Sequence, residues 1–208
     1  DLHSFPTRRS SDLHIGISAV LRDLGIGVGE RVATLAWNTQ AHVETWYGIM
    51  GLGAACHTLN PRLMAEQLAR QVMRTGCRII VASADLESLA RQIVERAPVV
   101  TYVLIIDGPA PARSGDCRVV HLETAMSQAR AAVTWGGFDE RTACGLCFTS
   151  GTTGAPKGVT YTHRSSFLHA LKLLQADVLG ITAADSVLAV VPMFHANAWL
   201  YGDRKSVV

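Results

Sequence analysis

The chain has 208 residues, of which 49% are hydrophobic, and this content is sufficient for the buried core of one large domain or most of one. Its formal net charge of +2 is too small to indicate a protein of nucleic acids or membrane surfaces, which carry clustered lysine and arginine. No apolar run approaches the roughly 18 residues that a membrane helix needs, and the N-terminus lacks the apolar core of a signal peptide. We therefore expect small-molecule partners, no nucleic acid, no transmembrane segment and a cytoplasmic location.

Apolar residues recur at helical spacing over 15–24, and a glycine-rich stretch then ends this predicted helix. Short apolar runs alternate with helical segments over the following part of the chain. The further predicted helices are 41–52, 64–75 and 86–95, and the predicted strands are 32–36, 54–59, 78–82 and 102–106. Apolar strands separated by long helices indicate a parallel sheet covered on both faces, so the sequence predicts the α/β class.

Five cysteines are scattered along the chain at Cys56, Cys77, Cys117, Cys144 and Cys147. Their odd number and irregular spacing do not indicate a disulfide framework and favour a reducing compartment. Cys144 and Cys147 match a C-x-x-C pattern, but they lie in an apolar run with no second Cys pair and no His at ligand spacing. We predict that both are small core residues on a strand.

The two ends of the chain back-translate to one DNA sequence read from opposite strands. GATCGGAAGAGCGTCGTG encodes Asp-Arg-Lys-Ser-Val-Val at 203–208, and its reverse complement, read from the third base, encodes Arg-Arg-Ser-Ser-Asp at 8–12. This DNA resembles a short-read sequencing adapter, so we expect 1–13 and 203–208 to be translated adapter and 14–202 to be a partial domain. The alternative is a basic N-terminal arm and a polar tail.

A glycine-rich segment, Thr149-Ser-Gly-Thr-Thr-Gly-Ala-Pro-Lys-Gly158, follows a predicted buried strand at 145–148. Its glycines let successive backbone N–H groups turn toward an anion, its hydroxyls add donors and Lys157 adds positive charge, which is typical of a phosphate-binding loop. A Walker A loop is excluded, because Pro156 precedes and Gly158 follows the lysine, where that motif requires Gly and Ser or Thr. A purely structural loop is the remaining alternative.

The segment resembles the phosphate-loop signature of the adenylate-forming enzymes, which include acyl-CoA synthetases, luciferases and peptide-synthetase adenylation domains. Three further segments resemble blocks of the same family: Gly29-Glu-Arg-Val-Ala-Thr-Leu-Ala-Trp-Asn38, His57-Thr-Leu-Asn-Pro-Arg62 and Gly158-Val-Thr-Tyr-Thr-His-Arg164. The resemblance covers about 16–201. It implies part of the family's N-terminal domain, with parallel-rich sheets covered by helices, and no C-terminal domain.

A second informative segment, Val191-Pro-Met-Phe-His-Ala-Asn-Ala-Trp199, follows an apolar run predicted to be a strand and resembles the family block that lines the nucleotide and acid pockets. Amino-acid-activating members usually carry Asp just after the Phe, where it pairs with the substrate ammonium group. His195 stands there and suits a carboxylic acid without an amine. The segment looks most like that of medium- and long-chain fatty-acyl-CoA ligases, which implies that Trp199 gates an acyl tunnel. The alternative is that His195 is simply hydrogen-bonded and Trp199 is a core residue.

The resemblance implies two reactions, in which a fatty acid is adenylated by ATP and the acyl group then passes to CoA, with Mg²⁺ as cofactor and a homodimer for the whole protein. The implied nucleotide-binding residues are Thr149, Ser150, Gly151, Thr152, Thr153, Gly154, Lys157, Ala196 and Trp199, with His195 as the catalytic residue and Thr149 as the Mg²⁺ ligand. The family's adenine-binding segment, second Mg²⁺ ligand and C-terminal lysine are absent from the sequence, so we expect the 208-residue chain itself to be inactive. Two alternatives stay open, a carrier-protein-loading or other carboxylate-adenylating enzyme and an inactive nucleotide-binding fragment.

Overall fold

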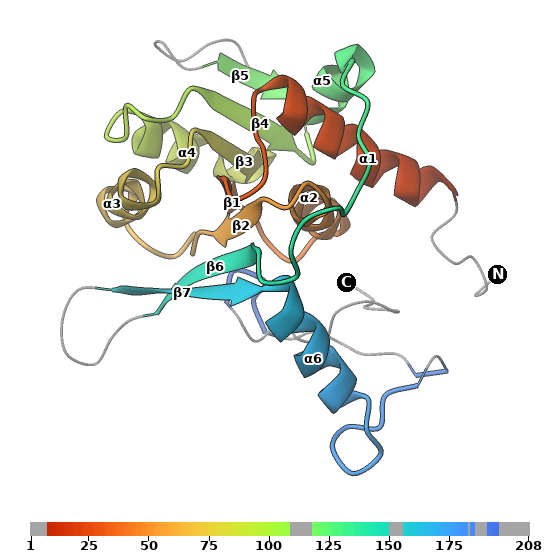
Figure 1. Cartoon of the computed structure of the whole chain (residues 1–208). Helices are drawn as coiled ribbons and strands as arrows, with labels where there is room; N and C mark the ends of the chain where they lie inside the picture. Colours follow the sequence, from red (N-terminus) through yellow and green to blue (C-terminus); the bar gives the residue numbers. More distant parts are fainter. Residues whose placement is uncertain (1–7, 109–117, 150–155, 183, 186–190, 196–208) are drawn as a thin grey trace.

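A computed structural model of the chain describes residues 8–108, 118–149, 156–182, 184–185 and 191–195. The centre of this part of the chain is a seven-stranded sheet with the order β5-β4-β3-β1-β2-β6-β7 (Figure 1). The strands are β1 (Arg31–Leu35), β2 (Ala55–Thr58), β3 (Ile79–Ser83), β4 (Tyr102–Ile106), β5 (Arg118–His121), β6 (Ala143–Thr149) and β7 (Lys157–Thr162). The helices are α1 (Arg8–Asp23), α2 (Gln40–Gly51), α3 (Ala65–Thr75), α4 (Glu87–Val94), α5 (Leu122–Gln128) and α6 (His163–Leu173), with a 3-10 turn, Ala84–Leu86, before α4.

Helices cover both faces of the parallel part of the sheet. Helices α1, α2 and α5 lie over one face, and α3 and α4 lie over the other (Figure 1). In β3, Ile79 and Val81 belong to the core under α1 and α2, whereas Ile80 and Ala82 belong to the core under α3 and α4. Because successive side chains of a strand point to opposite faces, a strand between two helix layers must be apolar at every position. The predicted α/β class with a helix-covered parallel sheet is therefore confirmed.

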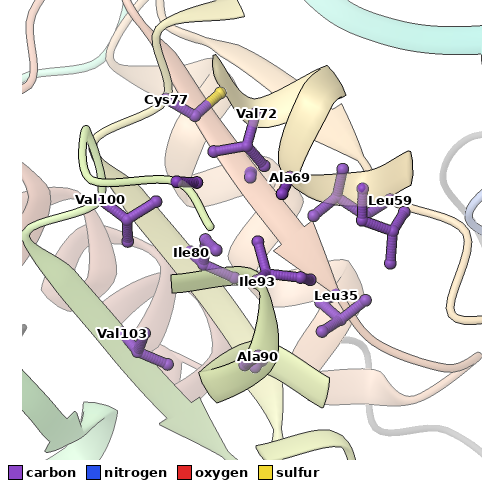
Figure 2. Close-up of a cluster of buried hydrophobic side chains, with 14 of the residues drawn as sticks. Leu35, Leu59, Ala69, Val72, Cys77, Ile80, Ala90, Ile93, Val100 and Val103 are labelled. Atoms are coloured by element: carbon purple, nitrogen blue, oxygen red, sulfur yellow. The ribbon is translucent and has the colours of Figure 1, made fainter. Parts of the chain in front are cut away.

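Figure 2 shows the core under α3 and α4, where side chains of the two helices meet those of the central strands. Leu35 of β1, Ile80 of β3 and Ile93 of α4 are fully buried there. Burial of one such side chain stabilises the fold by about 1.5–3 kcal/mol relative to leaving it exposed. This core fixes the positions of β1 and β3, and Asn38, which follows β1, contacts the segment 191–193, which forms part of the candidate site.

The structure differs from the sequence-based predictions mainly at the two edges of the sheet. Strand β5 and helix α5 were not predicted, and α1 begins at Arg8, earlier than the predicted start at 15. Strand β7 is antiparallel to β6, whereas all the other neighbouring strands are parallel in the part of the sheet that is described. The strand predicted just before residue 191 lies outside the described residues.

Cys144 and Cys147 both lie on β6 and are 1% and 6% exposed, which confirms the prediction that they are core residues. Burial raises the pKa of the Cys144 thiol, and its Sγ lies 3.4 Å from Ser166 Oγ. Over the described ranges, no group of three or more His, Cys, Asp or Glu side chains could hold a metal ion. The helices in these ranges also fall short of the length and apolar character that crossing a membrane requires.

Two histidines are fully buried, His42 on α2 and His57 on the central strand β2. His42 Nδ1 lies 2.9 Å from the carbonyl oxygen of Trp37, and its Nε2 lies 3.0 Å from Thr34 Oγ1. Since a carbonyl can only accept, Nδ1 carries a proton. In the neutral ring, which burial favours, Nε2 has no proton and accepts from the hydroxyl of Thr34. Burial lowers the pKa of His42 to about 4, and burial together with the charge of Arg31 lowers the pKa of His57 to about 3.

These two histidines should make the fold sensitive to acid. A histidine in an unfolded chain has a pKa near 6.5, so between about pH 6.5 and 4 the unfolded state binds protons that the folded state does not. The stability that depends on the neutral rings is fully present above about pH 6.5 and should fall as the pH is lowered toward 4. The shift at His42 alone, to about 4, corresponds to about 3 kcal/mol.

Urea unfolding at a series of pH values between about 7.5 and 4.5 measures this loss. Carboxylates also titrate in the lower part of this range, so the variant His42→Gln separates their contribution. We expect the variant to be less stable at neutral pH and to lose less stability on acidification. Equal pH dependence in both proteins would show that His42 does not cause the loss.

Candidate active site

The glycine-rich segment joins two antiparallel strands. Thr149 is the last residue of β6, Lys157 is the first residue of β7, and the two are register partners. Directly opposed residues of an antiparallel pair carry their side chains on the same face, with Cβ atoms about 4.5–5.5 Å apart, so Thr149 and Lys157 present their side chains on one face of the sheet. Both residues are exposed. Ser150, Gly151, Thr152, Thr153 and Gly154 lie outside the described residues.

Strand β6 is held in place by β2. The parallel register aligns Cys56 with Gly145 and Thr58 with Cys147, so the carboxyl ends of β2 and β6 lie side by side. In the order β3-β1-β2, the strand that follows β1 lies on one side of it, and the chain then crosses back so that β3 lies on the other side. In doubly wound sheets, ligands bind at the carboxyl ends of the strands near such a switch point. Thr149 therefore ends at the edge of the sheet where ligand binding is expected.

The second predicted segment reaches the same edge of the sheet. Asn38, which follows β1, donates through Nδ2 to the carbonyl oxygen of Val191 at 3.1 Å and accepts through Oδ1 from the backbone N–H of Met193 at 2.7 Å. Thr58, the last residue of β2, donates through Oγ1 to the carbonyl oxygen of Phe194 at 3.2 Å. These three hydrogen bonds bind residues 191–194 across the ends of β1 and β2.

Apolar and aromatic contacts complete the docking of this segment. Met193 and Phe194 are 5% and 8% exposed, so both are buried. The ring of Phe194 lies edge-on to Trp37, with centroids 6.3 Å apart, and the Arg62 guanidinium lies 5.7 Å from the centroid of Phe194. A buried aromatic anchor of this kind contributes both apolar burial and geometric specificity. The backbone leading to His195 is thus fixed against the sheet.

His195 lies exposed at the end of the docked segment. Its backbone N–H donates to the carbonyl oxygen of Pro192 at 3.0 Å, which closes a tight turn. Ala196 and Trp199 lie outside the described residues. The structure therefore brings Thr149 and Lys157 together and sets the segment that ends in His195 at the neighbouring strand ends.

Further polar contacts brace the ends of the adjoining strands. Trp37 Nε1 donates to Asp85 Oδ2 at 2.8 Å, and Thr39 Oγ1 donates to Asp107 Oδ2 at 3.1 Å. Asp107 has φ of 64°, a left-handed conformation that costs roughly 1 kcal/mol in a residue with a side chain. The hydrogen bond from Thr39 helps to hold Asp107 there, so the loops after β1 and β4 are tied to each other.

Asn38 and Thr58 were not predicted as site residues, although both lie in segments that resemble family blocks. The available signal was a polar residue at or shortly after the carboxyl end of each of two apolar strands, a position where parallel sheets present functional side chains. What these residues bind could not be read from the sequence, because their partners lie 136 to 155 positions away.

The sequence pattern of the AMP-binding enzyme family matches residues 16–202. The chain therefore belongs to this family. Its described part also has the fold of a solved relative, the N-terminal domain of FACL13 from Mycobacterium tuberculosis, with a TM-score of 0.77 and 26% identity. That comparison covers 93% of this chain and 46% of the relative.

Curated relatives include enzymes that form different acyl-CoA products. The chain is 43% identical over 188 residues to a 3-methylmercaptopropionyl-CoA ligase of Ruegeria pomeroyi, a match that covers 88% of the chain and 34% of the relative. It is 36% identical over 184 residues to a medium-chain-fatty-acid–CoA ligase of Ectopseudomonas oleovorans, again covering 88% of the chain and 34% of the relative. The chain thus spans about a third of the length of these two relatives.

Replacing Asn38 with Leu should release the segment that precedes His195. The variant Asn38→Leu removes two hydrogen bonds to this segment and leaves the N–H of Met193 without its partner, at a cost of about 1–3 kcal/mol. Hydrogen exchange followed by mass spectrometry should show faster exchange in peptides that cover 191–195. The matched control is Gln40→Leu, because Gln40 is exposed and, within the described part of the chain, its side-chain amide bonds only to Glu44. Equal exchange in the two variants would mean that Asn38 does not hold the segment.

Proposed function

We propose that the whole protein is an ATP-dependent acid–CoA ligase that activates a medium- or long-chain fatty acid. The observation that carries the proposal is the glycine-rich loop at the carboxyl end of β6, whose flanking residues Thr149 and Lys157 are register partners. Its strand β6 pairs with β2, and β2 binds the docked segment 191–195 through Thr58. Membership in the AMP-binding enzyme family supports a nucleotide at this loop.

The proposed reaction has two steps. A carboxylate oxygen of the acid attacks the α-phosphorus of ATP, which releases pyrophosphate and forms an acyl-adenylate. The thiol of CoA then attacks the acyl carbon, AMP leaves with the bonding electrons, and the thiol proton is released. Negative charge on the departing pyrophosphate is stabilised by Lys157 and by the donors of Ser150, Gly151, Thr152, Thr153 and Gly154, since phosphoryl transfer depends on positioned donors.

Thr149 is the proposed ligand of Mg²⁺. Its side chain offers a hydroxyl oxygen, and Mg²⁺ prefers oxygen donors and binds together with substrate phosphates. The residue is exposed at the end of β6, so its hydroxyl fits this role. Bound there, the ion would neutralise charge on the phosphate oxygens.

The acid is proposed to lie along the segment that contains His195, Ala196 and Trp199. An imidazole at the position after Phe194 supplies no carboxylate for a substrate ammonium group, which favours an acid without an amine. A second candidate is a short thioether acid, because one relative with 43% identity is named for 3-methylmercaptopropionyl-CoA. Transfer of the acyl group to a carrier protein instead of CoA is the other alternative.

A cytoplasmic location is part of the proposal. Within the described ranges, Cys56, Cys77, Cys144 and Cys147 are all buried and none of the four forms a disulfide. Secreted proteins commonly join their cysteines in disulfides, so thiols outside disulfides support a reducing compartment.

Acid-dependent exchange of labelled pyrophosphate into ATP by the full-length protein tests the function. We expect exchange with octanoate or palmitate and acyl-CoA release when CoA is added, whereas preferred exchange with 3-methylmercaptopropionate would establish the second candidate. Lys157→Ala should lower kcat/KM for ATP by about 10²–10³, the effect of removing one donor to a developing oxyanion. Lys172→Ala, an exposed lysine on α6, is the control and should leave the rate unchanged. Exchange only with amino acids would overturn the proposal.

A further inference from the structure

The last turn of α3 contacts the chain on both sides of the glycine-rich loop. The residues that lead into the loop and end at Thr149 are called its incoming stem, and those that leave it and begin at Pro156 are called its outgoing stem. Phe148 directly precedes Thr149 on the incoming stem, and Pro156 directly precedes Lys157 on the outgoing stem. Arg74 donates through Nη1 to the carbonyl oxygen of Pro156 at 3.2 Å, and its guanidinium carbon lies 5.8 Å from the centroid of the Phe148 ring. One side chain, from a helix on another part of the chain, thus bridges the two ends of the loop.

A second set of contacts joins the same turn of α3 to the incoming stem. Thr75, the next residue along the helix, has its Oγ1 3.2 Å from Nδ1 of His57. The His57 ring is buried, and its centroid lies 5.3 Å from that of Phe148. Phe148 is therefore held by His57 of β2 and by Arg74 of α3. The outgoing stem is also held by Arg74, through the hydrogen bond to Pro156.

The chemistry of the guanidinium explains why one side chain can make both contacts. Arginine carries several N–H donors in a planar fork and also stacks over aromatic faces, whereas the ammonium group of lysine is a compact and strongly hydrated charge. A glycine-rich loop loses much conformational freedom when it orders around a ligand. If the ends of the loop are already fixed before the ligand binds, less conformational entropy is lost on phosphate binding, and binding is stronger.

We propose that Arg74 is a positioning residue that fixes the two stems of this loop and thereby strengthens binding of the ATP phosphates. The proposal rests on the proposed function, because it assumes that the loop binds ATP. Arg74 acts through Phe148 and Pro156 and is not assigned a contact with substrate.

The kinetic test uses the full-length protein in pyrophosphate exchange. Arg74→Ala should raise the KM for ATP about ten-fold, the effect expected from losing one charge-assisted hydrogen bond and its cation–π contact at an exposed site. The KM for the acid and kcat should stay within about two-fold, since the acid segment is held by Asn38 and Thr58. Arg74→Lys keeps the charge but not the fork and should raise the KM for ATP by about three-fold.

Arg70→Ala is the matched control. Arg70 is exposed on the same helix and pairs with Glu66 at 2.7 Å, so its loss should leave the KM for ATP unchanged. Thermal unfolding midpoints of the variants identify any general loss of folding. In an active wild-type protein, an ATP KM in Arg74→Ala that matches that of Arg70→Ala overturns the proposal, as does an equal rise in the KM for the acid.

Hydrogen exchange of the same proteins separates failure of this proposal from failure of the proposed function. If the wild type shows no pyrophosphate exchange with any acid, the proposed function is rejected. The role of Arg74 in fixing the stems is then tested by the rate of hydrogen exchange in peptides that cover 156–162. Faster exchange in Arg74→Ala than in Arg70→Ala supports the fixing of the stems. Equal exchange in the two variants overturns it.

Discussion

Strand β2 is hydrogen-bonded in parallel to β1 along one edge and to β6 along the other, and the candidate site depends on this arrangement. All residues of Ala55–Thr58 are buried, so both faces of the strand are specified. Cys56 belongs to the core under α1 and α2, whereas His57 lies against Thr75 near the end of α3. A slip of one residue would exchange these faces and would bring His57 into the apolar core, which disfavours any other register. The carboxyl end of β6, and with it the start of the glycine-rich loop, is therefore fixed relative to β1.

The central strands could be predicted from the sequence because a strand buried on both faces leaves a continuous apolar run. The edge strands leave no such pattern. Strand β5, Arg118–His121, is only half-buried, and β7, Lys157–Thr162, is mostly exposed, so neither alternates or accumulates apolar residues clearly. The antiparallel direction of β7 follows from the short connection after β6, since a parallel neighbour requires a crossover of a dozen or more residues. The direction of β7 could not be predicted from the sequence, because the pairing of β7 with β6 was not known.

In the candidate site, too, features that depend on one contiguous segment could be predicted from the sequence, whereas contacts between residues far apart in the sequence could not. The glycine-rich loop is a contiguous pattern, so its chemistry could be predicted without any knowledge of the fold. The docking of residues 191–194 could not, because Asn38 and Thr58 reach partners more than a hundred positions along the chain. Arg74 belongs to the same class of missed residues. An arginine in the last turn of a helix ordinarily complements the helix dipole, and the contact of Arg74 with Pro156 depends on where the fold places the end of α3.

The proposed reaction requires the α-phosphate and the acid carboxylate to meet within about 3–3.5 Å, so the nucleotide loop and the acid segment must keep a fixed spacing. Both are anchored to β2. Thr58 bonds the carbonyl of Phe194, and the same residue is the register partner of Cys147, two positions before the loop begins at Thr149. A site built on strand ends is positioned more accurately than one built on loops alone. In the proposed site, the register of β2 would set the spacing of the reacting groups, and the side chains that follow Phe194 would select the acid, so one scaffold could serve many acids.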